Sequence, residues 1–463
     1  MPAVAPTPAS AVTCHDFADG LRLDLDLGVA QYPVFLTEKP AAILAKYCES
    51  LIGKPTHERQ SLRLNQPPRA IVLCDENTAE LFGVDIESQL ITAGWQVDAL
   101  TVTAGEAAKT LTAAEQICEA LASLSATRDT VLISLGGGVI SDLAGFVAGI
   151  YKRGMLLAHI STTLVGLVDA AIGGKTAVNL PSAKNQIGLY KHPLTIVSDP
   201  AYLATLPEEE YTCGLAEAAK TAILAGDDFM TWLEESSAAL KNREPGALRE
   251  LIARCISFKA EVVATDPVED NNPSERFSLN YGHTMGHVIE TITAARAQTA
   301  LTEYAAANPA PEDSPDLAPD TALILAQAGV SAPVPHGIAV AQGMRFEARM
   351  AMQLADASAD FVLRQDALLD ALGLPALDPA IMGTDLDMMG EVFARDKKNL
   401  DSDLRFILLS APAQPELVTV PQNILFDHLR TWLGLNVTPP QQPQSQPQLS
   451  QQPPQEQQQE DQA

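Results

Sequence analysis

The sequence has few basic residues for a chain of 463. It contains 30 Lys and Arg against 58 Asp and Glu, which gives a formal net charge of −28 at pH 7. Nucleic acids and anionic membranes repel a surface of that charge, so neither is expected as a partner. An anionic small molecule would need a local cluster of cations to hold it against this general field.

Paired cysteines and long apolar runs are also missing. The six cysteines include no C-x-x-C pair, which favours a reduced protein of the cytoplasm. No run approaches 18 apolar residues, and the opening MPAVAPTPAS lacks the basic and apolar regions of a signal peptide. We therefore expect a cytoplasmic protein that is neither secreted nor membrane-spanning.

The hydrophobic pattern divides the chain into two parts, and the length allows two domains. Strands and helices alternate from Ala70 to Val197, which predicts an α/β domain with a doubly wound, Rossmann-like parallel sheet. After Thr205 the hydrophobic period is helical, so the second domain is predicted to be mostly α-helical. The predicted helices of this domain are Gly214–Leu224, Met230–Leu240, Ala247–Ala264, Leu279–Ile292, Ile338–Ala355 and Phe361–Leu372.

Composition sets the predicted domain limits. We expect a disordered lead-in at 1–20, the α/β domain at 21–205, the helical domain at 206–437 and a disordered Pro/Gln-rich tail at 438–463. An Ala-, Pro- and acid-rich stretch at about 291–334 is predicted to be a surface insertion in the helical domain.

A strand, a glycine turn and a helix follow one another between Val131 and Ile150. The turn, Gly136–Gly138, lets an anion such as a nucleotide pyrophosphate approach the backbone N–H groups at the start of the helix. It is not the G-x-G-x-x-G fingerprint, so close packing of helix and strand is an alternative explanation. A second strand, Leu156–Ile160, leads in the same way into the hydroxyls of Ser161–Thr163.

A second short motif, GGKT, ends at Thr176 and looks like the end of a P-loop. The full motif requires a glycine five residues before Gly174. Asp169 occupies that position, so the sequence excludes a P-loop NTPase.

His283 and His287 are spaced i, i+4, so on a helix both imidazoles could reach one metal ion. Residue 284 is Thr rather than Glu, so this is not the zinc-protease motif, and a further ligand must come from elsewhere. Glu217 and Lys220 lie on one face of a predicted helix, which by itself indicates an ordinary ion pair. Spacing alone therefore leaves the ligand set open.

Several strings occur in the order and nearly the spacing of one known family. They are GGGVISDLAGF, TTLVGLVDAAIGGKTAVN, KNQIG, TLPEEEYTCGLAEAAK, NYGHTMGHVIE and HGIAVAQGM. On these strings the chain resembles the 3-dehydroquinate synthases, sugar phosphate cyclases of the shikimate pathway, from roughly Ile71 to Leu409. The resemblance implies a lyase of aromatic amino acid biosynthesis that converts 3-deoxy-D-arabino-heptulosonate 7-phosphate to 3-dehydroquinate and phosphate. It also implies NAD and zinc as cofactors, with cobalt as an alternative metal.

The resemblance further implies roles for individual residues. It assigns the metal to Glu217, His283 and His336 and leaves His287 free to meet the substrate. Arg153 would reach into the site of a neighbouring subunit, which implies a homodimer. The residues implied in substrate binding and catalysis are Arg153, Asp169, Lys175, Asn185, Lys220, Lys259, Arg276, Asn280, His287 and Lys397. Those implied in NAD binding are Asp75, Glu106, Lys109, Gly137, Gly138, Val139, Asp142, Thr162, Thr163, Lys175, Lys184, Tyr202 and Thr205.

Some positions depart from the residues that the family usually has. They are Ala104 for Asp, Ser141 for Gly, Ala170 and Ala171 for Ser, and Ile338 for Glu. The last matters most, because a carboxylate beside His336 would support it as a metal ligand and Ile338 cannot accept a hydrogen bond.

Three alternatives stay open. A sister cyclase acting on a carboxylate-free sugar phosphate would not need Lys259, Arg276 and Asn280, all of which are present. A metal-dependent polyol dehydrogenase would share a related fold but release NADH. A non-catalytic binding protein could retain the fold while its site decayed.

Overall fold

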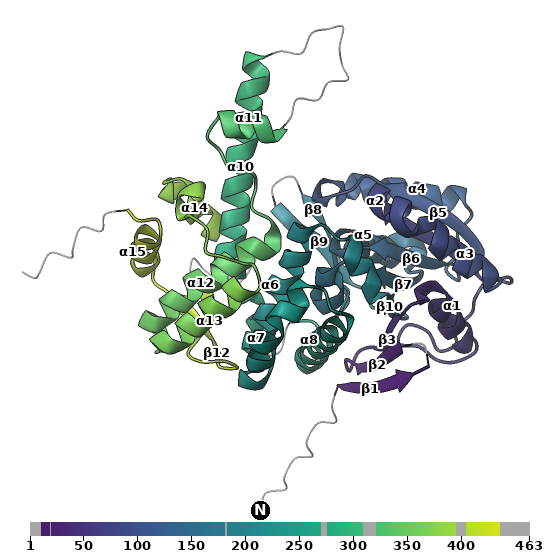
Figure 1. Ribbon diagram of the computed structural model, residues 1–463. Helices are drawn as coiled ribbons and strands as arrows, with labels where there is room; N and C mark the ends of the chain where they lie inside the picture. The colour runs from purple at the N-terminus through teal and green to yellow at the C-terminus, as the bar shows by residue number, and fades with distance from the viewer. Residues whose placement is uncertain are drawn as a thin grey trace, which may run out of the picture.

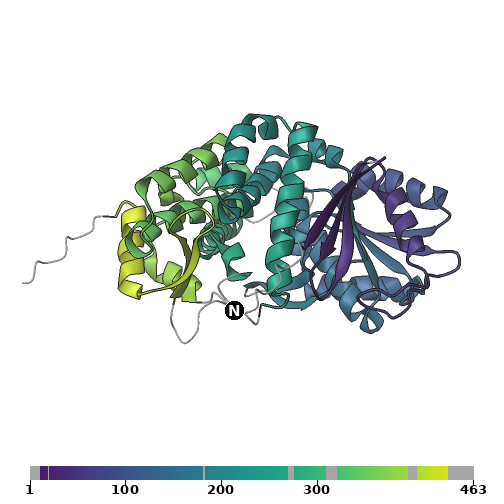
Figure 2. The same ribbon diagram turned by 90° about the horizontal axis from the view of Figure 1, so that it is seen from below.

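The computed structural model describes residues 11–18, 20–180, 183–269, 276–308, 321–394 and 404–435. Figure 1 shows two parts side by side, a sheet flanked by helices from the N-terminal half and a group of helices from the C-terminal half. Figure 2 shows the same division after a turn of 90°. The predicted tail at 438–463 lies outside the described residues.

An eight-stranded sheet forms the centre of the N-terminal part. Its strand order is β1-β2-β3-β10-β7-β6-β4-β5; the six strands from β3 to β5 run parallel, and β1 and β2 are antiparallel additions at one edge. The central strands β6 and β7 are completely buried, as parallel strands covered on both faces usually are. The strands are β1 Val12–Phe17, β2 Gly20–Asp26, β3 Gln31–Thr37, β4 Arg69–Asp75, β5 Gln96–Val102, β6 Val131–Gly136, β7 Leu156–Ser161 and β10 Ile196–Ser198.

Helices cover both faces of this sheet. Side chains alternate along β6, so that Val131 and Ile133 pack with α1 and α3, whereas Leu132 packs with α4 and α5. This arrangement confirms the predicted doubly wound α/β fold. The helices are α1 Pro40–Ser50, α3 Val84–Thr92, α4 Leu111–Ser123 and α5 Gly138–Ile150, with the single turn α2 Glu76–Thr78 after β4.

The predicted disordered lead-in at 1–20 is wrong for residues 12–17, which form β1. This strand pairs with β2 from Val12 opposite Leu25 to Phe17 opposite Gly20. Four of its six residues are exposed, so backbone hydrogen bonds rather than an apolar face hold it in place. A strand of this kind leaves little hydrophobic signal in a sequence.

A two-stranded hairpin follows β7, where the alternation of strands and helices did not predict one. Strand β8, Lys175–Leu180, pairs antiparallel with β9, Ala183–Tyr190. The hairpin packs closely on α5, since a Cβ on Gly149 would lie 2.5 Å from Leu189 Cδ1. Lys175 begins a strand rather than a helix, which agrees with the exclusion of a P-loop.

The C-terminal part is mostly helical, as predicted. At its centre is α6, whose side chains are buried from Tyr211 to Leu224, and which packs against α7, α8 and α12. A hairpin of β11 and β12, which the sequence did not predict, packs on α12. The elements are α6 Glu208–Ala225, α7 Asp227–Lys241, α8 Pro245–Thr265, α10 His283–Ala307, α11 Thr321–Gln327, α12 His336–Leu354, α13 Ala359–Ala371, α14 Leu386–Ala394, β11 Leu404–Leu409, β12 Pro415–Val420 and α15 Gln422–Trp432.

Helix α10 is longer than the predicted helix, which ended at Ile292. It continues to Ala307 and projects from the body of the protein, with α11 beside it (Figure 1). Ala297 is buried in a small apolar cluster with Leu325 of α11. The segment predicted as a surface insertion at about 291–334 therefore contains packed helix in its described residues. No helix in the described part of the chain has the length and apolar character needed to cross a membrane.

Candidate active site

The carboxyl ends of β4, β6 and β7 meet at one edge of the sheet, where open α/β sheets bind their ligands. Thr162 follows β7 there, and α5 begins at Gly138, so the N–H groups of Gly138 and Val139 lack partners within the helix. A Cβ on Gly137 would lie 2.7 Å from Thr163 Cγ2, so the close approach of the neighbouring turn requires glycine. Close packing therefore accounts for the glycine, and anion binding by the N–H groups of the turn stays a prediction.

Other residues predicted to bind NAD lie near this edge. Asp75 caps the turn after β4, where its carboxylate accepts a hydrogen bond from the Thr78 N–H at 2.8 Å. Tyr202 packs against Phe82 with ring centroids 4.2 Å apart and the rings tilted by 32°. Thr205 Oγ1 donates to the Tyr202 carbonyl at 2.9 Å. Asp75 therefore has a structural role besides the cofactor contact predicted for it.

A polar network around the buried Lys109 joins the glycine turn to the β8–β9 hairpin. Lys109 is 4% exposed, and its ammonium contacts the Asp142 carboxylate and, at 2.5 Å, Asn185 Oδ1. Burial raises the pKa of Asp142 even with Lys109 beside it. Asn179 Nδ2, from β8, donates to Glu106 Oε1 at 2.7 Å. The network thus connects residues predicted on the cofactor side with Asn185, which was predicted on the substrate side.

Three residues from three helices converge in the C-terminal part. Glu217 on α6 is 1% exposed, and its Oε1 lies 3.7 Å from His283 Nε2 on α10 and 3.4 Å from His336 Nε2 on α12. One ligand atom from each lies within 4.8 Å of the others. Both Glu217 oxygens are buried: Oε2 pairs with Lys220 Nζ at 2.6 Å, and Oε1 faces both imidazoles. Two imidazoles and such a carboxylate are a donor set that fits Zn2+ or a similar cation.

Both histidines turn Nε2 toward Glu217 because Nδ1 has another partner. His283 Nδ1 lies 3.2 Å from the Tyr281 carbonyl oxygen, and His336 Nδ1 lies 3.1 Å from Glu290 Oε2. A proton on Nδ1, donated to these oxygens, leaves the Nε2 lone pair free for a metal ion. The two imidazoles are thus oriented as ligands by different partners, one a backbone carbonyl and the other a carboxylate.

The charges of this cluster stabilise one another. Burial would raise the pKa of Glu217, but Lys220, His283 and His336 hold it well below its ordinary value. Burial would likewise lower the pKa of His336, but Glu217 and Glu290 raise it to about 10. The two carboxylates therefore attract positive charge to this point, and a bound cation would take the place of the His336 proton.

His287, one helical turn after His283, lies beside the set rather than in it. Its ring centroid is 5.6 Å from that of His283 and 6.3 Å from that of His336. The group of converging ligand atoms found among the described residues does not include it. A contact of His287 with the substrate remains a prediction.

Two lysines adjoin the metal cluster, Lys220 buried and Lys259 largely buried. Lys220, one turn after Glu217 on α6, pairs with Glu217 Oε2 at 2.6 Å. Lys259 on α8 donates to the Asp169 backbone oxygen at 2.6 Å and also contacts its carboxylate. Burial would raise the pKa of Asp169, but Lys259 and Lys220 lower it to about 2. Glu217, Lys220, Asp169 and Lys259 thus form one cluster in which acidic and basic side chains alternate.

Arg276 is a third buried cation, with 1% of its surface exposed. Its Nη1 donates to the Asp266 carbonyl oxygen at 3.2 Å, and its Nε lies 3.8 Å from Glu269 Oε1, a carboxylate that Lys175 also contacts. Nε is buried without a hydrogen-bond partner in the described chain. A guanidinium with an N–H group to offer fits a planar anion such as a carboxylate. Asn280 donates to a nearby backbone carbonyl at 3.3 Å.

Of the remaining predicted site residues, one stands apart from these clusters, one pairs with a carboxylate at the edge of the metal cluster, and one is not described. Arg153 is exposed just after the end of α5, with a φ of 62°. Lys184 on β9 pairs with Glu290 at 3.0 Å. Lys397 lies outside the described residues.

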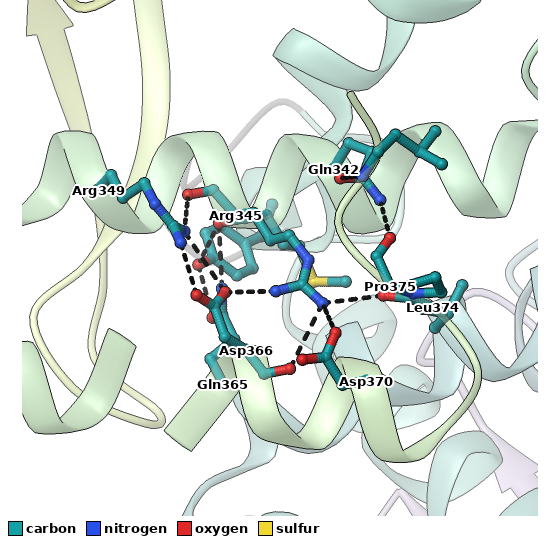
Figure 3. Close-up of polar contacts among 11 residues, drawn as sticks. Gln342, Arg345, Arg349, Gln365, Asp366, Asp370, Leu374 and Pro375 are labelled. Carbon is teal, nitrogen blue, oxygen red and sulfur yellow. Dashed lines mark hydrogen bonds and ion pairs between the residues drawn. The ribbon is translucent and has the colours of Figure 1, made fainter. Parts of the chain in front are cut away.

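Polar contacts along α12 fix the helix that carries His336. Arg345 is 2% exposed and pairs with Asp366 at 2.8 Å and Asp370 at 2.6 Å, both on α13 (Figure 3). Arg349 pairs with the other oxygen of Asp366 at 2.6 Å. These ion pairs hold α12 against α13, so the helix that begins at His336 is fixed in place.

Close packing of α10 on α12 fixes the other imidazole. Gly282, which precedes His283, donates its N–H to Glu347 Oε2 at 2.7 Å. It has a φ of 79°, and a Cβ there would lie 2.6 Å from the Val340 carbonyl oxygen. The two helices therefore pack closely beside His283.

Sequence reasoning missed two carboxylates of the site, Glu290 and Glu269. Glu290 lies about two helical turns after His283, so the helical period could have placed it on the same face. Glu269 lies in a loop without periodicity, where nothing in the sequence indicated its contacts with Lys175 and Arg276.

Solved structures show which class of protein has this fold. A 2-deoxy-scyllo-inosose synthase, solved with carbaglucose-6-phosphate, NAD+ and Co2+, superposes with a TM-score of 0.68 at 24% identity, covering 91% of this chain and 99% of that one. A 2-epi-5-epi-valiolone synthase from Streptomyces hygroscopicus, solved with NAD+ and Zn2+, gives 0.63 at 24% identity over 79% of this chain and 91% of its own. An iron-containing alcohol dehydrogenase from Thermococcus thioreducens gives 0.55 at 12% identity, covering 88% of this chain and 99% of that one. The chain therefore shares its fold with sugar phosphate cyclases and also with an iron-containing alcohol dehydrogenase.

Sequence comparison narrows the class to one family. Family models described as the N-terminal and C-terminal parts of 3-dehydroquinate synthase match residues 99–213 and 214–299. A 3-dehydroquinate synthase of Halorhodospira halophila is 38% identical over 341 residues, which cover 74% of this chain and 83% of that protein. One from Shewanella loihica is 33% identical over 397 residues, 86% of this chain and 95% of that protein. The chain belongs to the 3-dehydroquinate synthase family.

Proposed function

We propose that this protein converts 3-deoxy-D-arabino-heptulosonate 7-phosphate to 3-dehydroquinate with release of phosphate. The observation that carries the proposal is the convergence of Glu217, His283 and His336 beside buried cations. Relatives bearing that activity's name at 33–38% identity support it. A substrate with one phosphate and one carboxylate needs such cations in a chain of net charge −28.

We propose NAD and a divalent metal, zinc or cobalt, as the cofactors. The glycine turn at the start of α5 would hold the pyrophosphate, and Glu217, His283 and His336 would hold the metal. When bound, NAD supplies a reversible hydride acceptor and the metal supplies a Lewis acid. Solved cyclases of this fold contain NAD+ with Co2+ or Zn2+, which supports the assignment.

The protein's own groups would bind and orient the substrate. Arg276, with its unpartnered buried N–H, suits the carboxylate, and Lys259 and Lys220 suit the remaining anionic oxygens. Burial and the neighbouring charges of Lys220 and Arg276 lower the pKa of Lys259, although Asp169 acts in the opposite direction. Lys259 is therefore able to give up a proton more readily than a surface lysine. His287 and Lys175 would assist proton movement.

The quaternary structure and location belong to the same proposal. We propose a homodimer in which Arg153 completes the site of the partner subunit; its exposure and its separation from the clusters above support this. Ile150, one turn earlier, exposes 44% of its surface. Action in the cytoplasm accords with six cysteines that are all free. Mixing inactive Arg153→Ala and His336→Ala subunits tests the dimer, because a mixed dimer would regain one complete site.

Phosphate release from the heptulosonate, measured with and without a chelator, tests the activity. We expect release that stops when the metal is removed and returns with zinc. Net accumulation of NADH would instead indicate a polyol dehydrogenase. Turnover of a carboxylate-free sugar phosphate in preference to the heptulosonate would indicate a sister cyclase.

A further inference from the structure

Glu290 on α10 joins three elements at the edge of the metal cluster. Its side chain is 9% exposed. One oxygen, Oε2, lies 3.1 Å from His336 Nδ1 at the start of α12, and the other, Oε1, lies 3.0 Å from Lys184 Nζ on β9. Both carboxylate oxygens are therefore engaged, each by a different part of the fold.

The bond to His336 decides which imidazole nitrogen faces the metal position. A neutral imidazole carries one N–H, and a carboxylate can only accept, so Glu290 places that proton on Nδ1. Nε2, 3.4 Å from Glu217 Oε1, then keeps its lone pair toward the cluster. A carboxylate behind a ligating histidine also increases the basicity of the ligand.

The orientation of His336 depends on a side chain, whereas the orientation of His283 depends on the backbone. The backbone carbonyl of Tyr281 orients His283 at 3.2 Å, and no side-chain substitution removes it. The residue two positions after His336 is Ile338, which packs against the apolar core and cannot support the imidazole. Glu290 is thus the carboxylate that stands behind His336.

We propose that Glu290 is a positioning residue of the metal centre, and that Lys184 holds it in place from the β8–β9 hairpin. The proposal rests on the proposed function, since it assumes that Glu217, His283 and His336 bind a metal. It assigns to Glu290 the support that Ile338 does not provide. It also gives the β8–β9 hairpin a role in the metal site, because Lys184 on β9 pairs with Glu290 on α10.

Zinc dissociation constants, measured by competition with a chromogenic chelator, test the proposal. Glu290→Ala should weaken zinc binding by about 10- to 100-fold, the usual effect of removing such a partner. Glu290→Gln should weaken it less, because the amide oxygen still accepts from Nδ1. Lys184→Met should have an effect smaller than that of Glu290→Ala, because Glu290 keeps its bond to His336. Glu303→Gln, an exposed site on the same helix, should leave the constant unchanged.

Two results would overturn the proposal. One is a folded Glu290→Ala protein that binds zinc as tightly as the unaltered one. The other, decisive if Glu290→Ala does not fold, is unaltered zinc binding in both Glu290→Gln and Lys184→Met. If the unaltered protein binds zinc but releases no phosphate from the heptulosonate, the proposed function fails while the zinc constants still decide the role of Glu290.

Discussion

Lys220 and Glu217, one turn apart on α6, form an ion pair of 2.6 Å with both side chains buried, at 3% and 1% exposure. Glu217 also lies at the centre of the histidine cluster, so one carboxylate is shared between a fixed cation and the metal position. Lys220 keeps Glu217 ionised. Burial raises the pKa of Glu217, and among the neighbouring groups the charge of Lys220 lowers it most. The pair therefore connects the cations proposed for the substrate to the site proposed for the metal.

Removing Lys220 should destabilise the metal-free protein more than the metal-bound one. Lys220→Met leaves Glu217 buried without its cation, a change that typically costs about 3–5 kcal/mol. Zinc restores a positive charge beside Glu217, so the loss in Tm should shrink when zinc is added. Thermal unfolding with and without zinc measures this, with exposed Lys241→Met on α7 as the control. An equal loss in both states would show that Lys220 does not compensate the charge of Glu217.

Asp169 should contribute stability that depends on pH. Its pKa is held at about 2 in the folded protein, below the value of about 4 for a free Asp, so its contribution is present above about pH 4 and is lost as the pH falls toward 2. Asp169→Asn should therefore be destabilised most near neutral pH, and the difference from the unaltered protein should narrow below about pH 4. Chemical unfolding across this range measures the difference. A constant difference would mean that Asp169 and Lys259 do not interact as the structure shows.

Arg276→Lys should lower kcat/KM for the heptulosonate by at least about tenfold, on the order of 1.4 kcal/mol. A guanidinium can hold a carboxylate with two parallel hydrogen bonds, whereas an ammonium cannot reproduce that geometry. Steady-state kinetics of phosphate release give the ratio. Arg254→Lys is the control, because Arg254 on α8 is 36% exposed and pairs with Glu250 rather than with a predicted site residue. An unchanged kcat/KM in Arg276→Lys would reopen the alternative of a carboxylate-free substrate.

Arg345→Met should destabilise the protein by about 1–3 kcal/mol, because it removes a buried donor from Asp366, Asp370 and the Leu374 carbonyl oxygen. Arg349→Met removes the other partner of Asp366, but Arg349 is 38% exposed and its pair should contribute no more than about 1 kcal/mol. Urea unfolding of the two variants measures the contrast. Equal effects would show that the buried network does not fix α12.

Helices with strong local signals were predictable from the sequence. The pattern predicts a helix at Phe361–Leu372, and α13 spans Ala359–Ala371. Its start is set by Ser358, whose hydroxyl accepts from the Phe361 N–H at 3.1 Å. The strands β1, β8 and β9 were not predictable in the same way. β1 has a mostly exposed face, and the hairpin depends on packing against α5, which only the folded chain supplies.

The candidate site shows the same limit. Motifs located Glu217, His283 and His336, because those residues stand in long strings typical of the family. The spacing of His283 and His287 alone left the ligand set open, since the second histidine that faces Glu217, His336, comes from a separate helix. The contacts of Glu269 depend on a loop conformation and could not be predicted from residue types.

Zinc content of two purified variants, His336→Ala and His287→Ala, tests the central claim most directly. We expect elemental analysis to find no zinc in His336→Ala, whereas His287→Ala should retain zinc and lose activity. Glu217, His283 and His336 would occupy three positions of a tetrahedron and leave the fourth for substrate oxygens. Zinc retained in His336→Ala but absent from His287→Ala would contradict the metal site proposed here and the function built on it.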